Sequence, residues 1–373
     1  MQILPSNQQS PNILQRVRST INRFCILDSG YDSVAAVWAI GTYLIRRYNE
    51  PQAFDQYPIL RAASPDKESG KSTLRGVLEQ LVINPKKTMS TTTAALFRLL
   101  DREQKTVLID EFDTIMNKGG EAANDMTNIL NAGWERGGTV DRCTGKEFTS
   151  TEFHTWGAKA IFGNGDIADT TASRCITLVL KKKLPTESVE RLADAVRSEP
   201  EMFESLRAEI AQFCADHAEA IMAESANVPE DLGNRALDRW SPLFSIAQVF
   251  GSEVADELSE VARAIEAIAD DPPSAELTLL SLSKSAWSGS LAGRDRVTSG
   301  QLIEAINKLE PGLYLPARGG RSEAVTPRTY AARMRLFGVR PQQLGDGSHQ
   351  RGYFRADFDD AFNRYLPDTQ NKC

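Results

Sequence analysis

A ten-residue segment, Ser64-Pro-Asp-Lys-Glu-Ser-Gly-Lys-Ser-Thr73, constrains the fold of this chain more than any other feature. It follows a short apolar run that ends at Ala63, and it precedes a segment whose apolar residues have helical spacing. Gly-Lys-Ser between a strand and a helix is typical of a loop whose backbone N–H groups surround phosphate oxygens. The segment therefore predicts a strand, a phosphate-binding loop and a helix.

Within this loop, Lys71 is expected to reach the β and γ phosphates of ATP, and the Ser72 hydroxyl to ligate Mg²⁺. Proline stands where the full motif has its first glycine, and proline has a fixed φ and no N–H. A chance Gly-Lys-Ser at the start of a helix is the alternative interpretation. The other expected nucleotide-binding residues of the loop are Pro65, Asp66, Lys67, Glu68, Ser69, Gly70 and Thr73.

Two adjacent carboxylates, Asp110 and Glu111, end a second apolar segment that begins at Thr106. Charges are costly next to a buried strand, so a pair of them there indicates a purpose. We expect Asp110 to hold Mg²⁺ through water and Glu111 to polarise the water that attacks the γ-phosphate. The alternative is a strand that simply ends in a solvated acidic turn.

Three further residues are candidates because of their order along the chain. Asn164 ends a third apolar segment, where it would position the lytic water, although asparagine is also a common turn residue. Arg174 precedes a fourth segment and is a candidate arginine finger for a neighbouring subunit, or a surface arginine paired with Asp169. Arg235 would reach the γ-phosphate from a helical lid, or cap a helix through a salt bridge.

Two arginine-bearing regions predict contact with nucleic acid. The segment from Thr139 to Thr149 has the pattern of a β-hairpin with Arg142 and Lys146 near its ends, and a purely structural hairpin is the alternative. Residues 317–355 contain eight arginines and two acidic residues, and the alternative there is a solvated charged surface. The predicted contacts in the second region are Arg328, Arg333, Arg335, Arg340 and Arg351.

The alternation of strands and helices predicts an α/β fold with a P-loop AAA-like core, a parallel sheet covered by helices. We expect helical N-terminal and lid segments and a C-terminal winged-helix domain. The expected boundaries are 1–55, 56–185, 186–295 and 296–373. The longest apolar run, Val34 to Ile45, is too short to span a bilayer, and scattered cysteines and histidines predict neither a zinc site nor a disulfide framework. A cytoplasmic protein is expected.

The motifs resemble those of an uncharacterised, helicase-like P-loop ATPase domain family of phage, plasmid and bacterial proteins, often fused to primase or Toprim modules. This resemblance spans most of the chain, and it implies a role similar to that of replicative ring helicases. Asn164 and Arg235 are carried over by position alone. The segments that carry the resemblance are Ser64–Ser72, Ile109–Glu111, Asn131–Val140, Asp169–Arg174, Phe337–Pro341 and Gly352–Phe358.

The sequence thus predicts a Mg²⁺-dependent, ATP-hydrolysing DNA helicase or translocase that assembles as a homo-oligomeric ring. Its expected partners are single-stranded or forked DNA and a separate primase or replication protein, with no membrane. One alternative is a replication, regulatory or defence factor that binds DNA and uses nucleotide only as an assembly switch. Another is a small-molecule kinase, which the basic C-terminal region and Arg174 disfavour.

Overall fold

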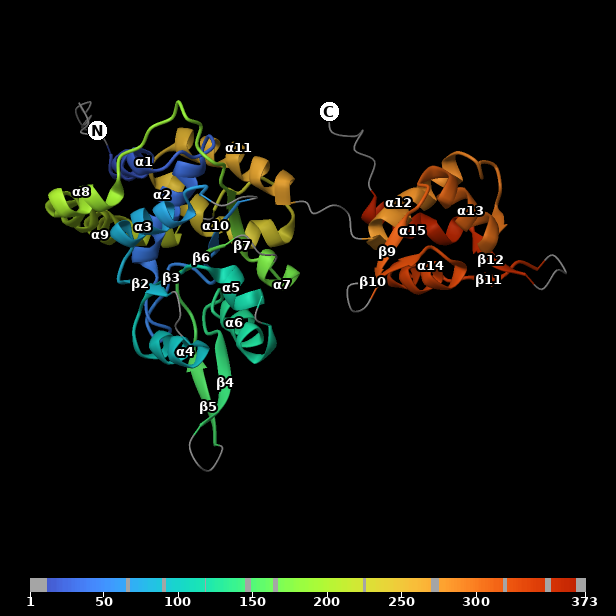
Figure 1. Cartoon of the computed structure of the whole chain (residues 1–373), viewed down its shortest axis with the longest axis horizontal. Coiled ribbons are helices and arrows are strands. Elements are labelled where there is room, and N and C mark those ends of the chain that lie inside the picture. The colour runs from blue at the N-terminus through green and yellow to red at the C-terminus, as the bar shows by residue number, and fades with distance from the viewer. Residues whose placement is uncertain are drawn as a thin grey trace. The chain divides into compact units, whose positions relative to one another are not determined.

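The computed structural model describes residues 12–64, 68–88, 92–117, 119–144, 149–163, 167–223, 226–269, 275–317, 321–345 and 350–366. The chain forms two compact units, Met1–Ala269 and Asp270–Cys373 (Figure 1). The sequence interpretation began its last domain at residue 296, whereas the second unit also contains α12 (Ala275–Ser288). Trp287 of α12 is part of the core of that unit, which explains why the helix belongs to it.

A parallel sheet of five strands lies at the centre of the first unit, in the order β2-β3-β6-β1-β7. Its strands are β1 (Ile59–Ala63), β2 (Pro85–Thr88), β3 (Thr106–Ile109), β6 (Lys159–Phe162) and β7 (Cys175–Val179). All four pairings are parallel. The predicted α/β architecture, a parallel sheet covered by helices, is confirmed.

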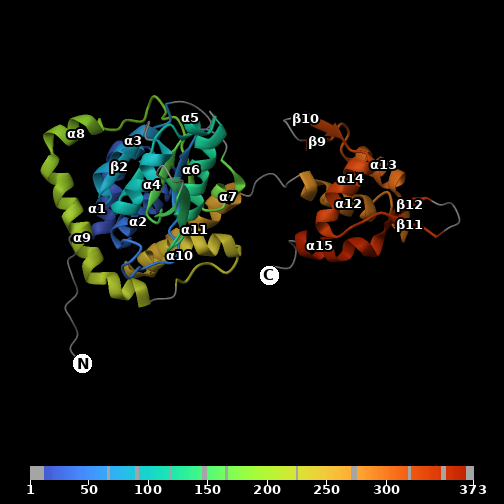
Figure 2. The same cartoon turned by 90° about the horizontal axis from the view of Figure 1, so that it is seen from below.

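Helices cover both faces of this sheet because successive strand residues point to opposite sides. Leu60 and Ala62 belong to one core with α1 (Ile13–Phe24), α2 (Tyr31–Gly41), α3 (Lys71–Leu81), α9 (Pro200–Ala223), α10 (Asn234–Val249) and α11 (Ser252–Ala269). Ile59 belongs to a second core with α4 (Thr93–Arg102), α5 (Phe112–Asn117) and α6 (Gly120–Ala132). Figure 2 labels these three helices in a view of the chain from below. The shorter helices of this unit are η1 (Thr42–Leu44), α7 (Asp169–Ala172) and α8 (Leu192–Ser198).

The long apolar run near the N-terminus forms a buried helix, as its composition predicts. Every residue of α2 is buried. Trp38 within it donates a hydrogen bond from its indole nitrogen to the carbonyl of Pro58, 2.9 Å away, just before β1. Among the helices of the described ranges, none combines the length and apolar character that crossing a membrane requires.

A β-hairpin extends away from the sheet in the first unit (Figure 1). Its strands are β4 (Thr139–Thr144) and β5 (Thr149–His154), which pair antiparallel with Thr139 opposite His154. The ring of Phe153 packs on that of Phe97 in α4, with centroids 4.6 Å apart. The predicted hairpin is confirmed, and its base is anchored on the core.

The second unit combines helices with small antiparallel sheets. The three-stranded sheet has the order β11-β12-β8, and β9 pairs with β10 separately. Side chains of Thr298 and Thr326 form capping boxes at the starts of α13 and α14. In chain order, the elements after α12 are β8 (Arg296–Thr298), α13 (Ser299–Leu309), β9 (Tyr314–Ala317), β10 (Arg321–Ala324), α14 (Pro327–Met334), η2 (Arg335–Phe337), β11 (Gln342–Gln343), β12 (Arg351–Phe354), η3 (Arg355–Phe358) and α15 (Asp359–Tyr365).

Candidate functional site

The loop between β1 and α3 lies at the carboxyl edge of the sheet. Gly70 precedes α3 with φ of 86°, a left-handed conformation that a residue with a side chain rarely adopts. A Cβ added at Gly70 would meet no described atom within 4 Å, so the space over this residue is open. The predicted loop residues Pro65, Asp66 and Lys67 lie outside the described residues.

Lys71 is the first residue of α3, and its side chain turns back over the loop. Its Nζ donates hydrogen bonds to the hydroxyls of Ser64 and Ser69, at 3.1 Å and 2.9 Å. Both serines are buried, while Ser72 is exposed on the next position of the helix. The arrangement holds an ammonium group and an available hydroxyl beside the N-terminus of α3, where backbone N–H groups attract anions.

A cavity of about 350 Å³ opens over this helix start. Its lining residues are Phe24–Leu27 at the end of α1, Glu68–Thr73, and Leu180, Lys181, Lys183 and Val189 after β7. An apolar wall thus faces a polar, cationic floor, which suits a ligand with a flat apolar part and an anionic part.

The sequence interpretation missed the wall formed by Phe24–Leu27. No local signal identifies it, because the wall exists only once α1 packs against α3. The lysines of the lining could have been found from the sequence, because a run of three lysines, Lys181 to Lys183, follows Leu180 just after the strand β7. Leu180 N–H donates to the carbonyl of Ala63 at 2.8 Å, which brings that run to the same sheet edge as the loop.

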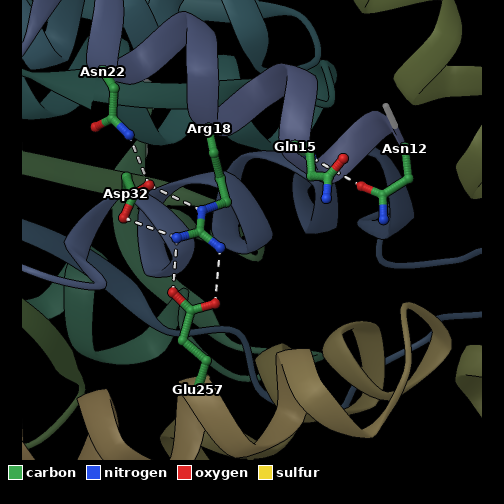
Figure 3. A network of polar contacts seen from close by, with 6 residues as sticks. All are labelled: Asn12, Gln15, Arg18, Asn22, Asp32 and Glu257. Carbon is green, nitrogen blue, oxygen red and sulfur yellow. Dashed lines mark hydrogen bonds and ion pairs between the residues drawn. The ribbon is translucent and has the colours of Figure 1, made fainter. Parts of the chain in front are cut away.

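An arginine on α1 anchors this wall to two other helices (Figure 3). The guanidinium of Arg18 contacts Asp32 of α2 through Nε at 2.9 Å and Glu257 of α11 through two nitrogens at 2.7 Å and 2.8 Å. Asn22 also donates to Asp32, at 2.8 Å. Since Arg18 lies less than two turns before Phe24, this network fixes the helix that ends at the cavity.

Asp110 and Glu111 follow β3 at the same carboxyl edge. The carboxylate of Asp110 lies 2.9 Å from Nε of Arg75, a residue of α3. Its other oxygen accepts the backbone N–H of Glu111 at 3.1 Å, and Glu111 itself is exposed with φ of 53°. Ser72 and Arg75 are three residues apart and share a face of α3. The face of α3 that carries Ser72 is therefore the face that meets Asp110.

Arg174 lies at the opposite edge of the sheet. Its carbonyl accepts the N–H of Ile59 at the start of β1, and its guanidinium lies 5.5 Å from the ring centroid of Trp134. Burial, and then the neighbouring charge of Arg235, lower the pKa of Arg174. Arg235 is thus close to Arg174, and it is not among the residues that line the cavity. The structure does not bring either arginine to Lys71 of the same chain.

Three candidate residues of the first unit remain, and of these the described residues include Arg142. Arg142 forms an ion pair with Asp125 of α6, and its guanidinium lies 5.5 Å from the ring of Phe97. Asn164 and Lys146 lie outside the described residues. For Arg142, the observed contacts are internal to the unit.

A fully buried lysine, Lys159 at the start of β6, was not predicted. Its Nζ donates to the carbonyls of Gly133, Thr155 and Gly157, at 2.8 Å, 2.7 Å and 2.9 Å. Burial lowers the pKa of Lys159 to about 7. This tripod ties the end of α6 and the end of the hairpin to the sheet, so we assign it a structural role.

The five arginines of the second unit that were predicted to contact nucleic acid differ in their surroundings. Arg333 forms ion pairs with Glu276 of α12 and Glu323 of β10, whereas Arg328 is exposed on α14. The other three predicted contacts line one surface cavity of about 390 Å³ together with Pro341. We call this cavity the arginine pocket, and its residues are Arg335, Arg340, Pro341 and Arg351.

A family model agrees with part of this chain. Residues 179–365, just over half of the chain, match the model described as Protein of unknown function (DUF3631). The chain belongs to this family. The DUF3631 match begins with the last residue of β7 and includes Arg235 and the arginine pocket, whereas Lys71, Asp110 and Glu111 precede it.

The other comparisons add little to the DUF3631 assignment. No curated protein matches the chain. Among solved structures, the A form apo structure of the NrS-1 C-terminal region has a TM-score of 0.43 and 11% sequence identity, covering 93% of this chain and 76% of that chain. A similarity at this level carries no argument about function.

Proposed function

We propose that this chain is a Mg²⁺-dependent P-loop ATPase that acts on DNA as a helicase or translocase, in replication or mobile-element DNA metabolism in the cytoplasm. The observation that carries the proposal is the ion pair between Arg75 and Asp110. It joins the helix that begins with Lys71 to the strand that ends in two acids. Two motifs that are distant in sequence therefore meet at one sheet edge.

The residues around the cavity fit a nucleoside triphosphate and Mg²⁺. When bound, Mg²⁺·ATP supplies the phosphoanhydride bond whose hydrolysis drives the motor. Lys71 would bind the β and γ phosphates, and Ser72 and Asp110 would hold the metal, Asp110 through water. Glu111 would orient the attacking water and take up its proton, and Asn164 is proposed to help position that water. The wall from Phe24 to Leu27 would bind the base.

The position of Arg174, away from Lys71 of the same chain, supports completion of the site by a second copy. In this proposal Arg174 acts in trans on the γ-phosphate of a neighbouring subunit, with Arg235 beside it, in a homo-oligomeric ring. Burial, and then the charge of Arg235, lower the pKa of Arg174, and an anion near the two arginines would offset the repulsion between them. An arginine supplied in this way can contribute on the order of 10³ in rate.

We propose that the second unit is a winged-helix DNA-binding domain. The order α12, β8, α13, α14, β11, β12, with the strands in one sheet, supports this assignment. Single-stranded or forked DNA is the proposed ligand, and a separate primase or replication protein the proposed partner. The face of α14 that carries Arg328 would lie against the nucleic acid.

A nucleotide switch with little hydrolysis is the second candidate, and one observation favours it. Both carboxylate oxygens of Asp110 already have protein partners, Arg75 and the N–H of Glu111. If Asp110 kept these two partners after nucleotide bound, the site would hydrolyse ATP slowly. Nucleotide binding alone would then control the assembly of the protein on DNA.

The variant Glu111→Gln tests the proposal against this second candidate. We expect the wild type to hydrolyse ATP faster with single-stranded DNA. We expect E111Q to retain ATP binding and lose about 10²- to 10⁴-fold in turnover, because a general base is removed. Glu121→Gln, an exposed glutamate of α6, is the matched control. Unchanged turnover in E111Q would reject the motor. Turnover without strand displacement on forked DNA would favour a switch or a defence-type ATPase, and little turnover in the wild type would favour the switch.

A further inference from the structure

Three arginines from separate segments converge on the arginine pocket. Arg335 begins η2, Arg340 follows the turn at Gly338, and Arg351 begins β12. All three are exposed, and Pro341 completes the lining. The convergence comes from the fold of the second unit, because Arg335 and Arg351 are sixteen positions apart in sequence.

The backbone that carries these arginines is well fixed. Gly338 has φ of 77°, and the N–H of Val339 donates to the carbonyl of Met334 at 3.1 Å, which reverses the chain after η2. Val339 and Met334 are fully buried, so this reversal is packed into the core. Arg351 donates from its guanidinium to the carbonyl of Pro341 at 2.8 Å, which ties β12 to the residue after Arg340. The backbone around the pocket is therefore held by core packing, and the side chain of Arg351 by its hydrogen bond.

Within the described part of the chain, the pocket arginines differ from their neighbours in having no acidic partner. Arg333 pairs with Glu276, and Arg355 pairs with Asp359. Among the described residues, no carboxylate forms an ion pair with Arg335, Arg340 or Arg351. Guanidinium groups gathered without an acid repel one another, and a bound anion removes that repulsion. The planar guanidinium also matches the geometry of a phosphate.

A further arginine indicates that the anion belongs to an extended polymer. Arg328 and Arg335 are seven residues apart, so they lie on one face of the continuous α14–η2 segment, about 10 Å apart along its axis. Both are exposed. A single small anion does not reach both positions, whereas a chain of phosphates does. Nucleic acid provides such a chain.

We propose that the arginine pocket binds one backbone phosphodiester group of DNA, with Arg335, Arg340 and Arg351 surrounding the same phosphate. The inference rests on the DNA role proposed above and deepens it, since it separates the pocket arginines from Arg333, whose contacts are internal. A contact to the backbone fixes the register of the protein on DNA and carries no base preference.

The test measures DNA binding by the full chain. Fluorescence anisotropy with a labelled forked DNA at several salt concentrations would compare the wild type with Arg335→Gln, Arg340→Gln, Arg351→Gln and the triple variant. Each single change should weaken binding about tenfold, because each removes a charge-assisted contact to the same phosphate. The triple variant should reduce the steepness of the fall of log affinity with log salt by about one unit, as for the loss of one phosphate contact, and not by about three.

Two controls accompany these variants. Arg294→Gln removes an exposed arginine of the same unit and should leave both affinity and salt slope unchanged. Arg340→Lys keeps the charge and loses the planar fork, so the salt slope should persist while affinity falls. Circular dichroism and thermal melting verify that every variant folds.

The outcomes separate this inference from the wider proposal. If the wild type binds DNA and the triple variant binds equally well with the same salt slope, the pocket inference is overturned and the DNA role remains. If inorganic phosphate alone occupies the pocket while the triple variant retains DNA binding, the pocket is a small-anion site and the inference fails. If the wild type binds no nucleic acid, the DNA role fails and the inference with it, although ATP binding could still be intact.

Discussion

Nε of Arg75 lies 2.9 Å from a carboxylate oxygen of Asp110, yet the N–H direction does not satisfy hydrogen-bond geometry. Each residue is 8% exposed. The contact is therefore a buried ion pair held by charge rather than by a directed hydrogen bond. Glu79, one turn further along α3, pairs with the other side of the same guanidinium at 2.7 Å.

The first prediction concerns Arg75→Met, which leaves the carboxylate of Asp110 without its counter-charge. We expect the free energy of unfolding to fall by roughly 3–5 kcal/mol in EDTA, because one partner of a buried pair is removed. Mg²⁺ and ATP should restore part of this loss, since the metal would take over as counter-charge. Thermal melting should therefore show a larger Mg²⁺·ATP shift for R75M than for the wild type.

Glu79→Gln is the control for this prediction, because it changes Arg75's other partner and leaves Asp110 untouched. Its Mg²⁺·ATP shift should equal that of the wild type. Equal shifts in R75M and the wild type would contradict a metal site at Asp110.

The second prediction concerns Arg174→Ala. Because Arg174 lies at the sheet edge opposite Lys71, the variant should bind ATP normally and lose on the order of 10³ in turnover. Mixing it with Lys71→Met should restore activity, since a mixed assembly contains some sites with both an intact Lys71 and an intact Arg174. ATPase assays of the mixture would measure this. Activity no greater than the sum of the separate variants argues against action in trans.

The third prediction concerns pH. Burial lowers the pKa of Lys159 from 10.5 to about 7, so between these values the unfolded chain holds a proton that the folded chain lacks. Stability from this group therefore rises with pH across that window, by up to about 1.4 kcal/mol per pH unit. Below pH 7 both states are protonated, and this contribution becomes constant.

Urea unfolding at pH 7, 8 and 9 would test the effect of Lys159→Met. The variant should lack the rise with pH, whereas Lys86→Met, which changes an exposed lysine of β2, should keep it. An identical pH dependence in the wild type and K159M would show that Lys159 does not titrate in this range.

The fourth prediction compares two arginines of α1. Arg18→Ala leaves Asp32, whose side chain is 11% exposed, with Asn22 as its one remaining side-chain partner among the described residues. We expect a loss of roughly 3 kcal/mol in unfolding free energy, and weaker ATP binding because the wall at Phe24 loses its anchor. Arg16→Ala breaks an exposed ion pair with Glu209 and should cost about 0–1 kcal/mol. Calorimetry of ATP binding and urea unfolding would measure both effects, and equal losses in the two variants would refute the anchoring role.

The sequence predicts the strands of the sheet wherever an apolar run ends in a turn, as at β1, β3, β6 and β7. It does not predict β2, because Pro85-Lys-Lys-Thr88 has no apolar alternation. This edge strand forms through pairing with β3, a long-range interaction that local pattern does not encode. For the same reason β9 and β10 form a hairpin where the sequence indicates only a loop rich in glycine and arginine.

The candidate site likewise contains residues whose location the sequence predicts and contacts that it does not predict. The location of Lys71, Ser72, Asp110 and Glu111 beside two strands was predictable from the motifs, and their roles stay predictions. The internal partners of two arginines were not, since Arg142 pairs with a residue 17 positions away and Arg333 with one 57 positions away. Whether either arginine also contacts DNA stays a prediction.

Lys71 and Arg174 lie at opposite ends of the strands of one sheet. Each protomer therefore carries two different halves of the proposed active site, far apart from each other. The five residues of β7 alone span about 16 Å, so a single chain cannot close the gap between them by a side-chain movement. Under the proposed mechanism, contact between protomers unites the halves, and repeated head-to-tail contact gives a closed ring or an open filament. A subunit that lacks either half would then disable a site that it shares with its neighbour, so a defective subunit is expected to lower the activity of wild-type subunits in the same assembly.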